Sequence, residues 1–333
     1  MTRSRAVFGH LDRRRFLGGL TATATALSLS GLTACGVSES EDESPKSGGG
    51  SAGGDGGTRT VRTDNGAVRV PAKAERVVVL ENYDALMLLD LGLVPVGVPD
   101  GAANAQILPR EQYDQLKGVA TIGASGSPNS QAVAALKPDL IIDQFYKEKS
   151  APLKTIAPVA YYDWHTSGSL WHQQIAKLAT AVGREDRLKD KKAAYEKRLS
   201  EVRTAYAKQI ATTTWAPLSG GPGGKFFLGS PLATVMRDVG LKLGAGLGPQ
   251  EAGFVPKSYE EMDVLKDCDV LIYSVQYDGK PTPTTQQLLD NKLWKNVPAV
   301  KAGRAFPSKH FLMANYTFAV GAVDEIEGML KKL

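Results

Sequence analysis

Residues 76–98 read RVVVLENYDALMLLDLGLVPVGV, and this stretch decides the fold class of the chain. Its first five residues form an apolar run rich in β-branched side chains, which is typical of a buried strand. Residues 83–92 then space their apolar side chains at helical intervals and end in glycine, a frequent helix stop. Residues 94–98 are strand-like again. A strand, a helix and another buried strand in succession predict an α/β protein with a mostly parallel sheet.

The same alternation continues along the chain. A short helix at 132–136 leads into a strand at 139–143, and the second half repeats the pattern. There we expect strands at 225–229 and 269–273 and helices at 231–240, 260–267, 288–293 and 319–330. These two halves predict two α/β lobes, residues 59–182 and 212–333. Ligands of such sheets bind outside the carboxyl ends of the strands, so we expect the binding site in a cleft between the lobes.

The segment between the lobes has a different pattern. Residues 170–211 lack proline and any strand pattern, and Gly183 is their only break. Residues 184–209 are dense in charged side chains, with apolar residues recurring every three or four positions. This spacing predicts one long, partly exposed helix. We therefore predict a connector helix at 183–211.

The N-terminus has the features of an export signal. Residues 1–34 are basic at first and then uncharged from 17 to 34, and the box LTACG follows at 32–36. We predict a signal peptide that is cleaved before Cys35, with lipid on the Cys35 sulfur. The pair Arg13-Arg14 resembles a twin-arginine (Tat) signal, although Asp12 stands where Ser or Thr is usual, so Sec export stays open. A permanent anchor helix is disfavoured because Thr, Ser and Gly dilute the apolar run.

Residues 35–58 are predicted to be a lipidated, disordered tether, because they are rich in Gly, Ser and acidic residues and poor in apolar ones. The folded domain would then lie at the extracytoplasmic face of the cell membrane. Loss of residues 1–34 lowers the formal net charge from +5 to +1, since they hold five Arg and one Asp. No basic patch remains that would favour nucleic acid. With Cys35 lipidated, only Cys268 is left, which excludes an intramolecular disulfide.

Four further stretches follow one another along the chain, namely VPAKAERVVVL at 70–80, LGLVPVGV at 91–98, AALKPDLI at 134–141 and IAP at 156–158. Together they resemble the substrate-binding lipoproteins of iron-siderophore ABC importers. The resemblance covers about residues 59–333. It implies two Rossmann-like lobes joined by a single rigid helix, in a monomeric receptor that binds a ferric siderophore. It also implies an ABC transporter permease as the partner.

The resemblance further implies an acidic residue on each lobe that docks an Arg pocket of the permease. Glu260 matches the motif of the second lobe, in Ser258-Tyr259-Glu260. The motif of the first lobe, Pro-Asn-x-Glu, is matched except at its end, where this chain has Gln131. A neutral amide does not give Arg the charge-assisted hydrogen bond of a carboxylate. For Glu260, a helix-capping role near Ser258 stays open.

Aromatic side chains are the candidate ligand contacts, because their faces suit a bulky iron chelate with an apolar scaffold. Those favoured among the aromatic residues at the expected strand ends are Tyr83, Tyr146, Trp164, Phe227, Tyr277 and Tyr316. After Arg110, arginines occur only in the connector region and at 237 and 304. A strongly anionic ferric tricatecholate would need several cations, so a ferric hydroxamate is the favoured ligand.

Other functions have less support in the sequence. Direct metal import would need a His, Asp and Glu cluster, whereas only His165, His172 and His310 follow the signal. Haem or cobalamin, ligated by His310 or a Tyr, is the alternative that stays open. We expect no enzyme and no cofactor, because 220–225 fails the phosphate-loop pattern and 244–248 fails the dinucleotide pattern. Residues 220–225 are expected to be a flexible turn.

Overall fold

The computed structural model describes residues 57–167, 170–244, 246–247, 253–312 and 314–333. These residues belong to one unit. The predicted signal peptide, Cys35 and the tether up to residue 56 lie outside the described residues. Among the helices that are described, none is both long and apolar enough to cross a bilayer.

The first lobe is built on a parallel five-stranded sheet in the order β5-β4-β3-β6-β7. Its strands are β3 (Val77–Val79), β4 (Gly97–Val98), β5 (Ala120–Thr121), β6 (Leu140–Asp143) and β7 (Val159–Tyr161). Its helices are α1 (Asn82–Asp90), α2 (Arg110–Leu116), α3 (Ser130–Ala135), α4 (Lys147–Ser150), α5 (Trp164–Ser167) and α6 (Trp171–Val182). A turn of 3-10 helix, η1 (Ala151–Thr155), follows α4.

The strand β3, from the apolar run expected at 76–80, forms the middle of this sheet because both of its faces are covered. Val77 and Val79 pack into the same cluster as α1 and α6, whereas Val78 points to the opposite face, toward Val133 of α3. Val78 pairs with Ile141 on one side and with Gly97 on the other. A strand buried on both faces reads as a continuous apolar run, which is why this element was predictable.

The first lobe also contains a hairpin that the sequence analysis did not predict. Strands β1 (Thr58–Thr63) and β2 (Gly66–Pro71) pair antiparallel. The backbone N–H of Asp64, in the turn of the hairpin, donates to the carbonyl oxygen of Tyr161 over 2.9 Å. The hairpin therefore lies beside β7, the last strand of the sheet.

The second lobe holds a six-stranded mixed sheet in the order β11-β9-β8-β12-β13, with β10 beside β8. The strands are β8 (Thr214–Gly221), β9 (Lys225–Leu228), β10 (Lys242–Leu243), β11 (Val255–Ser258), β12 (Val270–Ser274) and β13 (Ala305–Ser308). The helices are α9 (Leu232–Val239), α10 (Pro283–Asp290), α11 (Lys292–Asn296), α12 (Pro298–Lys301), α13 (Tyr316–Leu330) and the 3-10 helix η3 (Tyr259–Leu265).

The turn expected at 220–225 is present, since residues 222–224 close the antiparallel β8–β9 hairpin, in which Gly221 pairs with Lys225. The single helix expected at 288–293 is wrong, since α10 ends at Asp290 and α11 begins at Lys292. The cause is Asn291, which has an extended backbone and caps α11 by accepting from the backbone N–H of Leu293.

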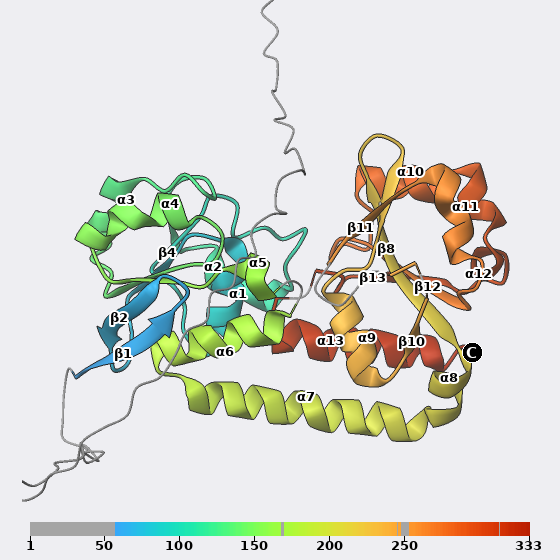
Figure 1. Ribbon diagram of the computed structural model, residues 1–333, viewed down its shortest axis with the longest axis horizontal. Helices are drawn as coiled ribbons and strands as arrows, with labels where there is room; N and C mark the ends of the chain where they lie inside the picture. The colour runs from blue at the N-terminus through green and yellow to red at the C-terminus, as the bar shows by residue number, and fades with distance from the viewer. Residues whose placement is uncertain (1–56, 168–169, 245, 248–252, 313) are drawn as a thin grey trace, which may run out of the picture. The chain divides into compact units, whose positions relative to one another are not determined.

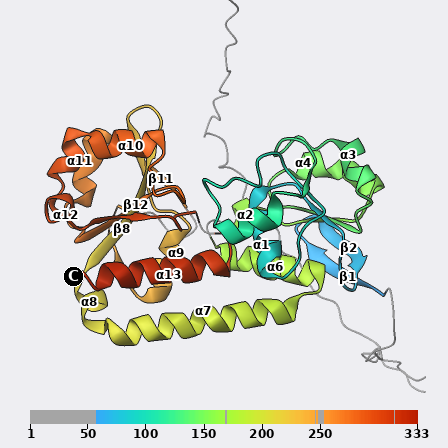
Figure 2. The same ribbon diagram turned by 180° about the vertical axis from the view of Figure 1, so that it is seen from behind.

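The connector is the helix α7 (Glu185–Ala205), which runs along one side of both lobes (Figures 1 and 2). Gly183 separates it from α6 with a φ of 68°, and a Cβ there would clash with the carbonyl oxygen of Ala72. The helix is shorter than the predicted 184–209. Tyr206, with φ −122° and ψ 26°, breaks it before the short α8 (Ala207–Thr212). The predicted α/β class, with two lobes joined by one long helix, is confirmed.

Candidate functional site

A cavity of about 500 Å³ lies at the carboxyl ends of three strands in the second lobe. Ser219 and Gly220 come from the end of β8, Ser274 ends β12, and Lys309 directly follows β13. One residue of the first lobe, Ile107, also lines this cavity. Since ligands of α/β sheets bind outside the carboxyl ends of the strands, the location is that of a binding site.

The apolar part of the lining is unusually exposed. Ile107, Phe254 and Leu312 are 42%, 40% and 47% exposed, and they are among the most exposed large apolar side chains of the described residues. All three line the same cavity, together with the half-buried Phe227. Apolar side chains that gather around a cavity mark a place where a partner or ligand covers them.

The polar part of the lining is almost entirely neutral. Hydroxyl groups from β12, from α10 and from the cap of α10 form a connected chain, in which Thr285 Oγ1 lies 3.1 Å from both Ser274 Oγ and Thr282 Oγ1. Thr285 also accepts from the backbone N–H of Gly220. Among the described residues of the lining, Lys309 carries the only formal charge. Such a surface suits a ligand of low net charge.

Tyr277 joins the second lobe to the first at this cavity. Its backbone N–H donates to the carbonyl oxygen of Gln106 over 2.8 Å. Its ring meets His310 edge-on at 5.6 Å. Burial raises the pKa of the Tyr277 hydroxyl, which has no hydrogen-bond partner among the described residues. A buried hydroxyl without a partner is costly, so this group is available to a ligand in the cavity.

The first lobe contributes an aromatic wall at the carboxyl ends of three neighbouring strands. Tyr83 follows β3, Phe145 and Tyr146 follow β6, and Trp164 follows β7. The Trp164 ring is stacked with both Tyr83 and Phe145, with centroids 5.7 and 5.5 Å apart. The structure therefore brings Tyr83, Tyr146 and Trp164, all candidates from the sequence, to one face of the first lobe. Figure 1 shows α1 and α5, which carry Tyr83 and Trp164, on the side of this lobe nearest the second.

Tyr316 is the candidate that the structure places elsewhere. It is the first residue of α13 and only 5% exposed, and its ring packs edge-on against Trp171 and Tyr195 at 4.9 and 5.7 Å. The reason is the preceding residue, Asn315, which caps α13 and turns the first residue of the helix into the core. Two of the six predicted aromatic residues, Phe227 and Tyr277, line the cavity. Tyr83, Tyr146 and Trp164 form the wall of the first lobe, whereas Tyr316 is part of the core.

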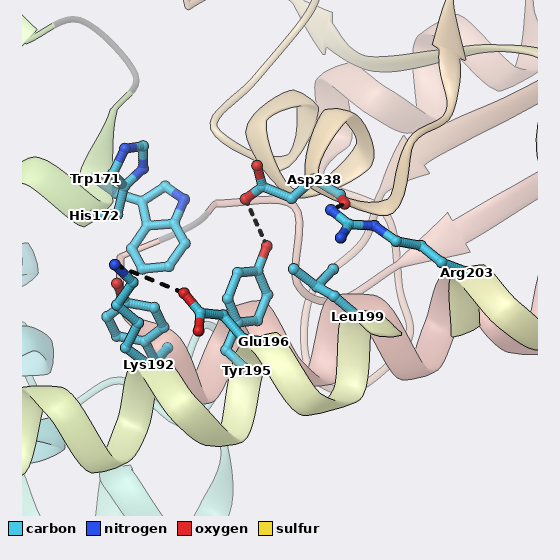
Figure 3. Close-up of a pocket in the computed structure, with 9 residues that line it drawn as sticks. Trp171, His172, Lys192, Tyr195, Glu196, Leu199, Arg203 and Asp238 are labelled. Carbon is cyan, nitrogen blue, oxygen red and sulfur yellow. Dashed lines mark hydrogen bonds and ion pairs between the residues drawn. The ribbon is translucent and has the colours of Figure 1, made fainter. Parts of the chain in front are cut away.

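Tyr316 lines a second cavity, of about 460 Å³, beside the connector. Figure 3 shows its walls, which come from α6, α7, α9 and α13. Tyr195 of α7 donates to Asp238 of α9 over 2.8 Å, across this space. Burial raises the pKa of Asp238 and lowers that of His172. None of the described residues that line this second cavity lies at a strand end.

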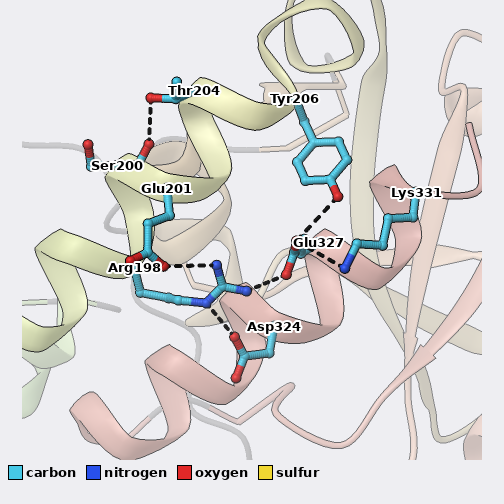
Figure 4. Close-up of polar contacts among 8 residues, drawn as sticks. All are labelled: Arg198, Ser200, Glu201, Thr204, Tyr206, Asp324, Glu327 and Lys331. Atoms are coloured by element: carbon cyan, nitrogen blue, oxygen red, sulfur yellow. Dashed lines mark hydrogen bonds and ion pairs between the residues drawn. The ribbon is translucent and has the colours of Figure 1, made fainter.

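The connector is fastened to the last helix by a network of charges (Figure 4). Arg198 of α7 donates to Asp324 over 2.7 Å and also to Glu327, both on α13. Glu327 accepts in addition from Tyr206 and lies 3.0 Å from Lys331. At its other end α13 contacts the first lobe, where the Thr317 N–H donates to Asp90 over 3.0 Å. Both α7 and α13 therefore bridge the lobes, which limits how far the lobes can move.

The two residues expected to dock a permease are both exposed. Glu260 lies in the first turn of η3, and hydrogen bonds from its own backbone N–H and from Ser258 lower its pKa. The capping box at Ser258 uses Glu261, whose carboxylate accepts from the Ser258 N–H over 2.8 Å. Capping therefore does not require Glu260. Gln131 lies in the first turn of α3, after its cap Asn129.

The described residues contain no candidate site for a bare metal ion. Among them, no group of three or more His, Cys, Asp or Glu side chains could hold one. His310 Nδ1 lies 3.1 Å from a carboxylate oxygen of Glu325. His165 is exposed, and its backbone N–H donates to Asp163. The three histidines thus lie in separate environments.

Comparison with known proteins gives a consistent result. The family model described as periplasmic binding protein matches residues 77–308. The chain is 29% identical over 293 residues to the probable siderophore-binding lipoprotein YfiY of Bacillus subtilis (strain 168), covering 82% of this chain and 85% of that protein. It is 24% identical over 293 residues to the iron(3+)-hydroxamate-binding protein FhuD of the same organism, covering 84% and 86%.

Among solved structures, the chain is similar to the siderophore periplasmic binding protein from the fuscachelin gene cluster of Thermobifida fusca. The TM-score is 0.69 and the identity 32%, and the match covers 79% of this chain and 99% of that one.

Proposed function

This chain belongs to the periplasmic binding protein family, and we propose that it is a lipid-anchored receptor that delivers a ferric siderophore to an ABC importer. The family consists of binding proteins, which confirms the expectation that the chain is not an enzyme. The observation that carries the proposal is the cavity at the strand ends, where exposed apolar side chains surround a neutral chain of hydroxyls. The ligand that suits this cavity is iron bound in an organic chelate, because the described residues include no group of three His, Cys, Asp or Glu side chains that could hold a bare ion.

The chelate that fits this lining best is a ferric trihydroxamate. Three hydroxamate groups neutralise Fe³⁺, so the complex needs no counter-charge from the protein. A ferric tricatecholate carries a net charge of about −3 and would have to be matched by several cations, since unpaired buried charge is costly. The described lining offers Lys309 alone. The relative FhuD, whose name records a hydroxamate ligand, supports the same assignment.

Delivery requires attachment to the membrane and contact with the permease. The box at 32–36 supports lipidation of Cys35, and the relative YfiY is itself called a lipoprotein. Glu260 is the docking residue of the second lobe, where its exposed carboxylate can pair with an Arg of the permease. Gln131 is the exposed neutral counterpart on the first lobe and makes a weaker contact.

Binding is expected to involve only a small closure of the lobes. The apolar core is continuous from α1 and α6 through α7 to α9 and α13. Two helices, α7 and α13, contact both lobes. A site that is largely preformed loses less entropy on binding, so affinity comes from shape and burial rather than from a large rearrangement.

Fluorescence titration tests the chelate class, because Trp164 lies in the aromatic wall of the first lobe. The purified protein is titrated with the ferric complexes of a trihydroxamate, a tricatecholate and citrate, and with haem and cobalamin. We expect saturable quenching and the lowest Kd for the trihydroxamate. Tight binding of haem or cobalamin without binding of any ferric siderophore would refute the proposal.

A further inference from the structure

The wall of the first lobe carries a carboxylate that has no cationic partner. Glu81 caps α1, where one of its oxygens accepts from the Asn82 N–H over 2.9 Å. Its other oxygen accepts from the Tyr146 hydroxyl over 3.0 Å. No ion pair among the described residues includes Glu81. Its side chain is half-buried beside the aromatic wall.

Two further acidic residues lie near the carboxyl ends of the neighbouring strands β3 and β6. Asp84 belongs to α1, which follows β3, and Asp143 is the last residue of β6. Asp84 and Asp143 are both fully buried. The Gln144 amide donates to one oxygen of Asp84, and the backbone N–H groups of Phe145 and Tyr146 donate to one oxygen of Asp143. The other oxygen of each carboxylate has no partner, and neither has the carbonyl oxygen of the fully buried Gln144. Acceptors thus outnumber donors at this end of the sheet.

The negative charge of Glu81 acts on the aromatic wall. Burial, and after it the charge of Glu81, raises the pKa of Tyr146 to about 12. The same two causes raise the pKa of Tyr83. Burial and then the charge of Asp143 hold the pKa of Asp84 well above its usual value. Burial disfavours a charge of either sign, whereas the charge of Glu81 disfavours an anionic group at this wall and favours a cationic one.

Nearby cations do not cancel this charge at the wall. Lys147, next in sequence to Tyr146, is exposed, and its ammonium lies over the Tyr161 ring, 5.9 Å from the centroid. Lys309 belongs to the other lobe, after β13. The two lobes therefore present charges of opposite sign, the carboxylate of Glu81 on the first lobe and the ammonium of Lys309 on the second.

We propose that the ligand presents a protonated amine to Glu81 and to the ring faces of Tyr83, Phe145 and Trp164. A carboxylate beside stacked aromatic rings is the combination that recognises an alkylammonium group, through an ion pair and cation–π attraction. The inference rests on the proposed function and narrows its substrate class to ferric trihydroxamates that carry a free amine. Glu81 and the stack then determine which hydroxamate complexes the receptor prefers and how they are oriented between the lobes.

A matched pair of ligands tests this directly. The ferric Desferal complex has a terminal primary amine, and its N-acetylated form keeps the iron chelate but loses the charge. We expect the wild-type protein to bind the amine form at least about fivefold more tightly, the effect of one charged hydrogen bond. Glu81→Gln, which keeps an acceptor oxygen, should remove this preference, because it lowers the affinity for the amine form more than the affinity for the acetylated form. Glu111→Gln, at an exposed site on α2, is the control and should keep the preference.

The outcomes separate this inference from the function on which it rests. Equal wild-type affinities for the two complexes, or a preference that persists in Glu81→Gln, would overturn the inference while leaving hydroxamate binding in place. Failure to bind either complex would overturn the hydroxamate assignment and the inference together. If Glu81→Gln does not fold, the wild-type preference measured against NaCl decides, because a preference due to charge declines with salt and one due to shape does not.

Discussion

The backbone N–H of Tyr277 donates to the carbonyl oxygen of Gln106 over 2.8 Å, so the two lobes meet directly at the edge of the main cavity. Ile107, the residue after Gln106, lines that cavity from the side of the first lobe. This hydrogen bond joins the backbones of the two lobes. It therefore sets the distance between the lobes at the cavity largely independently of the side chains. The width of the site is therefore a property of the fold, and its specificity resides in the side chains.

Tyr277→Phe should weaken ligand binding without destabilising the protein. The hydroxyl has no partner among the described residues, so its removal costs no internal hydrogen bond and can raise the free energy of unfolding by up to about 1 kcal/mol. We expect the same hydroxyl to hydrogen-bond the ligand in the complex, so its loss should raise Kd about three- to tenfold. Titration and thermal melting of the variant check both effects. An unchanged Kd would exclude the Tyr277 hydroxyl from the ligand contact.

Phe227→Ala should raise Kd by about 5- to 30-fold, because it exposes apolar ligand surface worth about 1–2 kcal/mol. Leu293→Ala is the matched control, since Leu293 is 44% exposed on α11 and does not line the main cavity. Its Kd should equal that of the wild type. An equal rise in Kd in both variants would indicate that the substitutions act through the stability of the protein and not through the ligand contact.

Arg198→Ala should loosen the attachment of α7 to α13. Its side chain is 23% exposed and contacts two carboxylates of α13, so we expect a loss of about 1 kcal/mol in the free energy of unfolding. Lys192→Ala should lose less than about 0.5 kcal/mol, because the Lys192–Glu196 pair is exposed on one helix. Urea denaturation of the wild type and of both variants measures these losses in the free energy of unfolding.

The contribution of this network should disappear in acid. Hydrogen bonds from Lys331 and then Arg198 lower the pKa of Glu327 below its usual 4.5. A carboxyl with a depressed pKa stabilises the folded state above its unfolded pKa, and this stability is lost as pH falls through the folded pKa. The difference between wild type and Arg198→Ala should therefore be full at pH 6 and shrink below about pH 4.5. A difference that is constant from pH 6 to pH 3 would contradict the role assigned to Glu327.

Docking can be separated from binding by measuring uptake of radioactive iron by cells that express each variant. Glu260→Gln should lower uptake at unchanged Kd, and Gln131→Glu should raise it, because each change alters one charged hydrogen bond to the permease. Glu111→Gln, exposed on α2, should change neither quantity. Uptake that is the same in all three variants would remove Glu260 and Gln131 from the docking surface.

The elements that could be predicted from the sequence are those whose patterns reflect burial. Residues 77–80 are buried on both faces of the sheet, and Gly183 marks a left-handed residue between two helices. The central strand β8 was missed because Pro217 and two terminal glycines are atypical of strands, although the pairing with β12 and β9 overrides their local preference. The β1–β2 hairpin was missed because its strands are mostly exposed and lack a long apolar run.

The site was only partly predictable for a related reason. Aromatic residues after strands were found because the carboxyl ends of parallel strands converge, which is true of Tyr83 and Trp164. Tyr316 met the same criterion, yet its position at the start of α13 turns it into the core. Ile107 and Phe254 were missed, since a single apolar residue in a loop has no periodicity to distinguish it. Only the spatial gathering of exposed apolar side chains around one cavity identifies them.

The location of iron in a crystal of the complex tests the central claim most directly. Crystals grown with a ferric trihydroxamate would be measured at the iron absorption edge, and an anomalous difference map would locate the metal. We predict a single strong peak between the cavity that contains Phe227 and Tyr277 and the aromatic wall at Trp164. A peak in the second cavity, beside Trp171 and Asp238, or no ordered iron at saturating ligand, would contradict the account.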